Sequence, residues 1–191
     1  MSAKKPRLII VAGANGSGKT TFAVPYTEQI GIQFLNADQF AKAYADGGEK
    51  NAMIKGGREF FRRLNGALER KEDVVIETTL SGSYTSKVVQ RAKKRGYTVE
   101  VVYIFIDSPE LCVERVRHRV LLGGHHVPEE DVVRRYHRSV LNFVQNFTDT
   151  VDVWFLYYNG ENGFQSVAQG ESGETQVITP LLFLKFNELW Q

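Results

Sequence analysis

The sequence predicts an α/β fold in which a parallel sheet lies between layers of helices. Apolar runs typical of buried strands alternate with helical patterns, and the expected strands are residues 8–12, 32–36, 72–76, 98–106 and 152–158. The chain has 191 residues, 42% of them hydrophobic, which is enough to bury the core of one domain. A glycine-rich motif follows the first strand, where such sheets bind phosphates. We therefore expect a single domain over residues 1–191.

Residues 13–20, with the sequence GANGSGKT, match GxxxxGK[ST], the loop whose backbone N–H groups hold the phosphates of a nucleoside triphosphate. Lys19 is expected to reach the β- and γ-phosphates, and Thr20 to ligate Mg²⁺. No guanine-specifying motif is present, so ATP is the default nucleotide and GTP stays open. The predicted nucleotide-binding residues are Gly13, Asn15, Gly16, Ser17, Gly18, Lys19, Thr20 and Thr21.

The expected order of elements is that of a P-loop kinase. Helical patterns, several with capping residues or terminal glycines, occur in residues 39–70 (interrupted at 46–48), 83–95, from Ser108, from Pro128 and in 181–190. Residues 164–179 are expected to form a hairpin around Gly170-Glu171-Ser172-Gly173. The predicted fold is a P-loop NTPase with a five-stranded parallel sheet between helices, a lid, a C-terminal hairpin and a short helix.

Composition and charge exclude several classes of protein. Lys and Arg number 24 against 22 Asp and Glu, so the net charge of +2 argues against a general nucleic-acid binder. The one cysteine, Cys112, allows no internal disulfide and is expected in the core. No stretch approaches the ~20 apolar residues that span a bilayer, and the N-terminus does not resemble a signal peptide. A cytoplasmic protein without a membrane partner is expected.

Polar residues follow two predicted strands, at the sheet edge where ligands bind. Asp38, after the second strand, could accept the proton of an attacking hydroxyl, or it could cap the following helix. Glu77, Thr78 and Thr79 end the third strand. Glu77 could hold acceptor hydroxyls or a water on Mg²⁺, and the two threonines could add hydrogen bonds.

A lid is expected over about residues 113–138. Six arginines and all four histidines lie between Glu114 and Arg138, and Gly123-Gly124 forms a hinge between them. Two or three of these arginines are expected to neutralise the transferring phosphoryl group, with Arg119 and Arg134 as candidates, while the others form a solvated basic face. Adjacent histidines such as His125 and His126 rarely bind one ion, so a zinc site is not favoured.

Four blocks of sequence together resemble the zeta toxin family, in its short, free-standing branch. They are the P-loop, Asn36-Ala37-Asp38, residues 77–82, and the lid from Arg115 to Tyr136. The resemblance covers about residues 8–158. It implies an ATP-dependent kinase with a hydroxyl acceptor, such as UDP-N-acetylglucosamine for the best-known members, and a possible helical antitoxin partner.

The resemblance also implies roles for single residues. Lys19 and Thr20 serve ATP and Mg²⁺, Asp38 becomes the general base, and Glu77 and Thr78 contact the acceptor. The chain departs from the family at His125-His126-Val127-Pro128, where long toxins have an arginine just before the proline, and Arg134 or Arg135 is expected to substitute for it. A second departure is Tyr158-Asn159-Gly160, where relatives are expected to read Asp-Asn-Ser.

Two other functions remain open from the sequence. A nucleoside or polynucleotide kinase would use the basic lid to hold a nucleic-acid hydroxyl, although the near-neutral total charge weakens this reading. A nucleotide-dependent switch would hydrolyse ATP slowly and act through a protein partner. The first predicts salt-dependent acceptor binding, and the second predicts partner capture without any phosphorylated product.

Overall fold

The computed structural model describes residues 4–171 and 173–191, and it is built around one mixed sheet with the strand order β2-β3-β1-β4-β5-β6-β7. The first five strands in that order are parallel, as predicted, and β6 and β7 are antiparallel. The strands are β1 (Arg7–Ala12), β2 (Gln33–Leu35), β3 (Val74–Thr78), β4 (Thr98–Phe105), β5 (Val153–Gly160), β6 (Gly163–Glu171) and β7 (Glu174–Val177). The sheet thus has seven strands rather than five, because the predicted C-terminal hairpin joins its edge.

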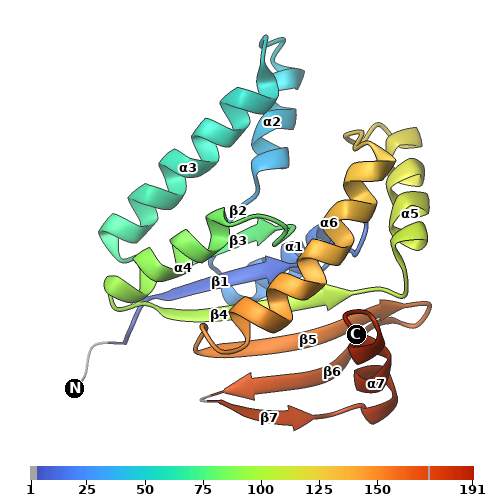
Figure 1. Ribbon diagram of the computed structural model, residues 1–191. Helices are drawn as coiled ribbons and strands as arrows, with labels where there is room; N and C mark the ends of the chain where they lie inside the picture. Colours follow the sequence, from blue (N-terminus) through green and yellow to red (C-terminus); the bar gives the residue numbers. More distant parts are fainter. Residues whose placement is uncertain (1–3, 172) are drawn as a thin grey trace.

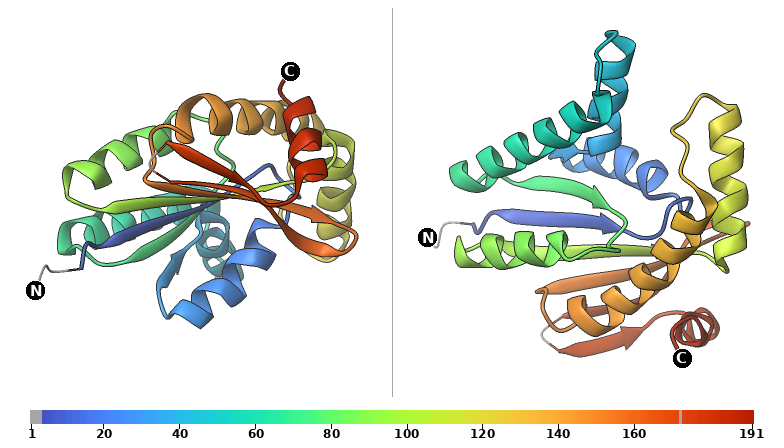
Figure 2. Two further views of the ribbon diagram at one scale, coloured as in Figure 1. Left: turned by 90° about the horizontal axis from the view of Figure 1, so that it is seen from below. Right: turned by 45° about the horizontal axis from the view of Figure 1, so that its top comes forward.

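Helices cover both faces of the sheet (Figures 1 and 2). One face, with Ile9, Val11 and Val75, packs against α1. The opposite face, with Leu8 and Ile10, holds the larger core cluster, to which the helices α3 to α7 contribute buried residues and against which α2 packs with Ala37 and Phe40. The helices are α1 (Lys19–Ile30), α2 (Ala37–Asp46), α3 (Ala52–Arg70), α4 (Tyr84–Lys94), α5 (Pro109–Leu121), α6 (Glu129–Asn142) and α7 (Pro180–Glu188).

Most helix ends follow the predicted signals. The Ser108 hydroxyl caps α5 by accepting the Leu111 N–H at 3.2 Å, and Pro128 directly precedes α6. The expected break at residues 46–48 separates α2 from α3. The predicted hairpin turn includes Ser172, which lies outside the described residues. Across the described chain, none of the helices combines the length and the apolar character that crossing a membrane requires.

Helix α6 runs on into η1, a π-helix over Phe143–Phe147. The spacing of Val133, Tyr136, Val140 and Val144 predicts one apolar face for α6; Tyr136 and Val140 are buried as predicted, but the residue buried in the first turn is Val132. The buried residues of α6 are Val132, Tyr136, Ser139 and Val140, so the buried face begins one residue earlier than predicted. This rotation decides which arginines of α6 can face the P-loop.

Helices α2 and α3 form a hairpin that stands above the carboxyl edge of the sheet (Figure 1). They approach closely at Gly56, where an added Cβ would lie 2.4 Å from the backbone nitrogen of Ala41. Only glycine permits this contact without displacing the backbone. The contact holds α3 against the helix that carries Asp38 in its first turn.

Candidate active site

The P-loop joins β1 to α1 at the carboxyl edge of the parallel strands. Gly13, Gly16 and Gly18 have φ of +145°, +81° and +94°, which side chains other than glycine rarely adopt. An added Cβ at Gly13 would lie 2.2 Å from the Ile104 carbonyl oxygen, and one at Gly18 would lie 2.3 Å from Asn159 Nδ2. Both positions therefore require glycine for conformation and for space.

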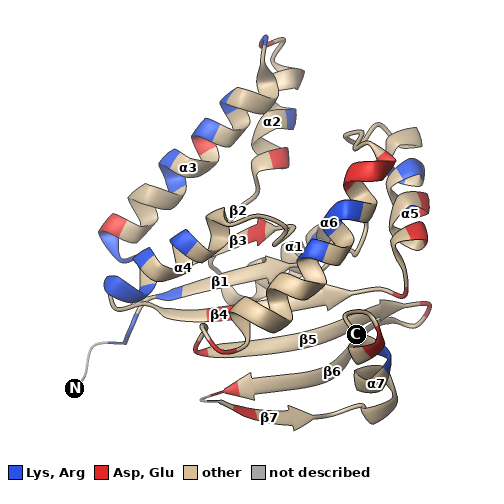
Figure 3. Cartoon of the chain, in the orientation of Figure 1, with Lys and Arg blue, Asp and Glu red and all other residues tan. Residues whose placement is uncertain are grey.

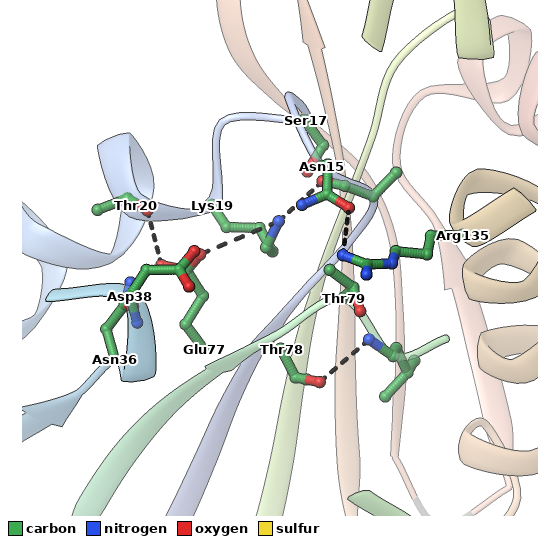
Figure 4. A network of polar contacts seen from close by, with 12 residues as sticks. Asn15, Ser17, Lys19, Thr20, Asn36, Asp38, Glu77, Thr78, Thr79 and Arg135 are labelled. Carbon is green, nitrogen blue, oxygen red and sulfur yellow. Dashed lines mark hydrogen bonds and ion pairs between the residues drawn. The ribbon is translucent and has the colours of Figure 1, made fainter. Parts of the chain in front are cut away.

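Lys19 lies at the centre of the site with only 7% of its surface exposed. Its Nζ donates to the Ala14 carbonyl at 2.8 Å and lies 4.0 Å from Glu77 Oε1 (Figure 4). Burial lowers the Lys19 pKa, while the negative charges of Glu77 and Asp38 act in the opposite direction. The two carboxylates are thus close enough to favour the charged form of the lysine.

Glu77 is the penultimate residue of β3 and accepts two hydrogen bonds. The Thr20 hydroxyl donates to Oε2 at 2.8 Å, and Asn36 Nδ2 donates to the same oxygen at 2.8 Å (Figure 4). Thr20 is the residue expected to ligate Mg²⁺. The carboxylate therefore lies beside the hydroxyl that is expected to ligate the ion.

Asp38 is exposed in the first turn of α2 and does not cap that helix. The cap is Asn36, whose Oδ1 accepts the N–H groups of Asp38 at 2.8 Å and Gln39 at 3.3 Å. The capping alternative for Asp38 is therefore wrong. Figure 4 shows the Asp38 side chain on the same side of the site as Glu77 and Lys19.

Thr78 and Thr79 stabilise the loop after β3. Thr78 Oγ1 accepts the Leu80 N–H at 3.1 Å and lies 3.2 Å from the Thr85 hydroxyl. The Thr79 hydroxyl pairs with that of Ser81 at 2.9 Å. A contact of Thr78 with an acceptor, as predicted, would use the same hydroxyl oxygen that already accepts the Leu80 N–H.

Helices α5 and α6, with residues 122–128 between them, form the predicted lid (Figure 1). On α5, Arg119 lies close enough to Lys19 for its charge to lower the lysine pKa. Arg119 Nη2 donates to the His125 carbonyl at 2.9 Å, whereas its Nε is buried without a hydrogen-bond partner. Arg115, one turn earlier, donates to the Asn159 carbonyl at 3.2 Å. Both arginines thus face the P-loop side of the lid.

The structure brings Arg135 of α6, rather than the sequence candidate Arg134, toward the P-loop. Arg135 Nη1 lies 3.5 Å from Asn15 Oδ1 (Figure 4). Arg134 forms an ion pair with Asp131, and its side chain is 49% exposed. Arg117 pairs with Glu129 on the outer surface of the lid, as expected for the solvated basic face.

We expect Arg135→Ala to reduce phosphoryl transfer by about 10- to 100-fold, since one charge-assisted contact to phosphate is lost. Arg134→Ala is the matched control and should change the rate less than about twofold, because exposed ion pairs contribute little. Steady-state kinetics with ATP as the varied substrate measure both variants. A larger effect of Arg134→Ala would return the phosphate contact to the residue chosen from the sequence.

Residues at the end of β5 contact the P-loop and, through Asp107, α7. Asn159 Nδ2 donates to the Ser17 carbonyl of the P-loop at 2.9 Å. The Tyr158 hydroxyl contacts Asp107 Oδ1 and Oδ2 at 2.9 and 2.8 Å, and Lys185 of α7 pairs with the same carboxylate. The sequence signal for Asn159 was its position at the end of a predicted strand. Its hydrogen bond to Ser17, 142 residues away, cannot be predicted from one sequence.

The lid histidines His125 and His126 are exposed on the loop before α6. In the part of the chain that the structure describes, no three His, Cys, Asp or Glu residues are grouped so as to hold a metal ion. Cys112 is buried in the core, as predicted, and burial raises its pKa to about 12. The polar groups that the structure brings together at this edge of the sheet belong to the P-loop, Glu77, Asp38 and the lid arginines.

Comparisons with known proteins agree with this geometry. The family model described as Zeta toxin matches residues 1–162. A Haemophilus influenzae protein described as uncharacterized is 30% identical over 130 residues, which cover 68% of this chain and 92% of that protein.

Solved structures share the fold at lower sequence identity. A complex of AvrRxo1-ORF1 and AvrRxo1-ORF2 with ATP is 22% identical with a TM-score of 0.73, and the match covers 96% of this chain but only 64% of that chain. The PezAT toxin-antitoxin system of Streptococcus pneumoniae is 18% identical with a TM-score of 0.67, covering 100% of this chain and 80% of that chain. A putative kinase from Chloroflexus aurantiacus has a TM-score of 0.58 at 19% identity, covering 71% of this chain and 80% of that one.

The family match extends from the P-loop through the strand-end carboxylates to the lid and β5. These are the segments that form the site, and they lie on a P-loop kinase sheet. The chain therefore belongs to the zeta toxin family and has the fold of a P-loop kinase, a phosphotransferase.

Proposed function

We propose that this protein transfers the γ-phosphate of ATP·Mg²⁺ to a hydroxyl of a small molecule, a nucleotide sugar such as UDP-N-acetylglucosamine. The observation that carries the proposal is the convergence of Lys19, Thr20 and Glu77 with the exposed carboxylate of Asp38. A P-loop alone explains nucleotide binding. A second carboxylate at the same edge, not engaged in helix capping, supplies what transfer to a hydroxyl requires.

In the proposed reaction, the acceptor oxygen attacks the γ-phosphorus in line with the bond to the β-γ bridging oxygen. The new O–P bond forms as that bond breaks, and ADP leaves. Asp38 accepts the proton of the acceptor hydroxyl. Lys19, Arg119 and Arg135 neutralise charge on the phosphoryl oxygens, and the lid excludes water that would otherwise compete with the acceptor.

The residues of the site fit a nucleotide with Mg²⁺. Among the residues that the structure describes, the buried Ser17 hydroxyl of the P-loop and the buried Arg119 Nε have no hydrogen-bond partner. Both donors are available to phosphate oxygens. When bound, Mg²⁺ neutralises charge on the β- and γ-phosphates, and the Thr20 hydroxyl, with Glu77 beside it, would hold it.

We further propose an antitoxin as a protein partner. Two of the similar solved structures support this: the AvrRxo1-ORF1:-ORF2 complex and the PezAT toxin-antitoxin system. A helical inhibitor that obstructs the nucleotide site would be sufficient to silence the transfer.

Mass spectrometry of acceptors incubated with the protein and ATP·Mg²⁺ or GTP·Mg²⁺ tests the reaction. The panel holds nucleotide sugars, nucleosides and short oligonucleotides. We expect a nucleotide sugar to gain one phosphate, only when a triphosphate and Mg²⁺ are both present. Phosphorylation of an oligonucleotide alone would identify a polynucleotide kinase, and ADP release without any phosphorylated acceptor would identify a nucleotide-dependent switch.

A further inference from the structure

Phe61 of α3 and Tyr84 of α4 form an exposed aromatic pair. Their ring centroids are 4.7 Å apart with an interplanar angle of 60°, and 41% and 38% of the two residues remain exposed. Ile54, two helical turns before Phe61, is 57% exposed and extends the apolar surface. A contiguous apolar surface of this kind, unlike isolated exposed residues, marks a binding site.

Tyr84 lies at the carboxyl edge of the sheet, a few residues after the end of β3. Tyr84 begins α4 and is followed by Thr85, whose hydroxyl lies 3.2 Å from that of Thr78. Thr78 in turn follows Glu77 in β3. Figure 1 shows the start of α4 at the same sheet edge as the P-loop, with α3 passing above it.

The pair is held in place by both helices. Below it, Arg91 Nη2 of α4 donates to Asn65 Oδ1 of α3 at 2.8 Å. Above it, Gly56 packs on Ala41 of α2, one turn from Asp38. The two rings are therefore presented on a rigid surface, which lowers the entropic cost of binding a flat ligand.

Positive charge flanks the aromatic pair. Arg58 lies three residues before Phe61, and Lys87 lies three residues after Tyr84, so each is a neighbour on the helix surface. Both are exposed, and neither forms an ion pair within residues 4–171 and 173–191. By contrast, Arg62 and Arg63 are both bonded to Glu59. Figure 3 shows basic residues in blue on α3 and α4.

We propose that Phe61 and Tyr84 are specificity-determining residues that stack on the nucleobase of the acceptor, while Arg58 and Lys87 attract its phosphates. Stacked aromatic side chains with nearby cations are how proteins bind bases without reading their sequence. The acceptor is then a nucleotide derivative rather than a free sugar or an apolar alcohol. This inference rests on the proposed kinase function and adds to it the surface that selects the acceptor.

Kinetics with two acceptors that share one sugar test the proposal. UDP-N-acetylglucosamine carries a base, and N-acetylglucosamine 1-phosphate does not. We expect Phe61→Ala and Tyr84→Ala to raise the KM for the first acceptor by about 5- to 100-fold, the usual effect of losing one stacked base. The kcat, the KM for ATP and the kcat/KM for the second acceptor should stay within about twofold.

Two control variants separate stacking from a general loss of apolar surface. Tyr84→Phe keeps the ring and should behave as the native protein. Leu184→Ala removes a 60% exposed apolar side chain on α7, away from the proposed site, and should also be silent. Equal effects of Tyr84→Ala on both acceptors, or no effect on either, would overturn the proposal.

A binding measurement keeps this test independent of catalysis. Calorimetric titration of UDP into the protein saturated with a non-hydrolysable ATP analogue and Mg²⁺ should show binding that Phe61→Ala and Tyr84→Ala weaken and Tyr84→Phe retains. If no acceptor is phosphorylated but UDP binds in this way, the kinase proposal fails and the stacking surface stands. If UDP does not bind, or binds both alanine variants as tightly as the native protein, the stacking surface is wrong.

Discussion

Asp38→Asn is expected to reduce phosphoryl transfer by about 10²- to 10⁴-fold while leaving ATP binding unchanged. The amide has the size of the carboxylate but cannot accept the proton of the acceptor hydroxyl. ATP binding is expected to depend instead on the P-loop and the lid. Asp38 makes no hydrogen bond to the P-loop within the described part of the chain. Single-turnover transfer and calorimetric ATP titration measure the two properties separately.

The control for this variant is Asp46→Asn at the other end of the same helix, also exposed. It should leave transfer within about twofold of the native rate. Asp38 also lies near the positive end of α2, so its neutralisation removes about 0.3–1 kcal/mol of helix stabilisation. Urea unfolding of Asp38→Asn should therefore show only this small loss. Full transfer activity in Asp38→Asn would exclude the residue as the base.

The sequence predicted the P-loop reliably because its requirements are local. Two glycines, a lysine and a hydroxyl at fixed spacing specify both the backbone conformation and the ligand chemistry. The role of Asp38 was ambiguous because Asn36 and Asp38 are both good capping residues. Their roles depend on where α2 begins, and the start of a helix shifts by one or two residues for reasons of packing.

The lid shows a similar limit. Arg134 and Arg135 are adjacent, so about 100° of rotation about α6 separates their directions. The orientation of α6 is set by burial of Val132 and Tyr136 against the core, whereas the sequence pattern favoured a face starting at Val133. The sequence pattern does not fix this orientation to within one residue, so it could not decide between Arg134 and Arg135.

Non-local pairings account for the other differences. The C-terminal hairpin was predicted, but its antiparallel addition to β5 depends on the register between Val153 and Glu171. The contacts of Asn159 with the P-loop and of Lys185 with Asp107 likewise join distant segments. Hydrophobic periodicity reports which residues are buried and carries no information on which distant segment they meet.

Lys19→Met is expected to reduce transfer by at least about 10²- to 10³-fold and to weaken ATP binding. Among the described residues, Lys19 is the only buried cation of the P-loop, and the substitution removes it. Lys19→Arg should fail as well. It keeps the charge, but the wider guanidinium cannot occupy the position between the Ala14 carbonyl and Glu77. Activity in Lys19→Arg comparable to that of the native protein would show that charge alone is sufficient.

Stability should move in the opposite direction from function at this position. Burial lowers the Lys19 pKa, which means that the folded protein pays a desolvation cost to keep the ammonium charged. Methionine retains the length of the side chain and removes this cost, while Glu77 keeps its hydrogen bonds from Thr20 and Asn36. The Tm of Lys19→Met, measured by calorimetry without nucleotide, should therefore not fall. A lower Tm would mean that the pairing of Lys19 with Glu77 and Ala14 outweighs desolvation, and that the lysine stabilises the loop it serves.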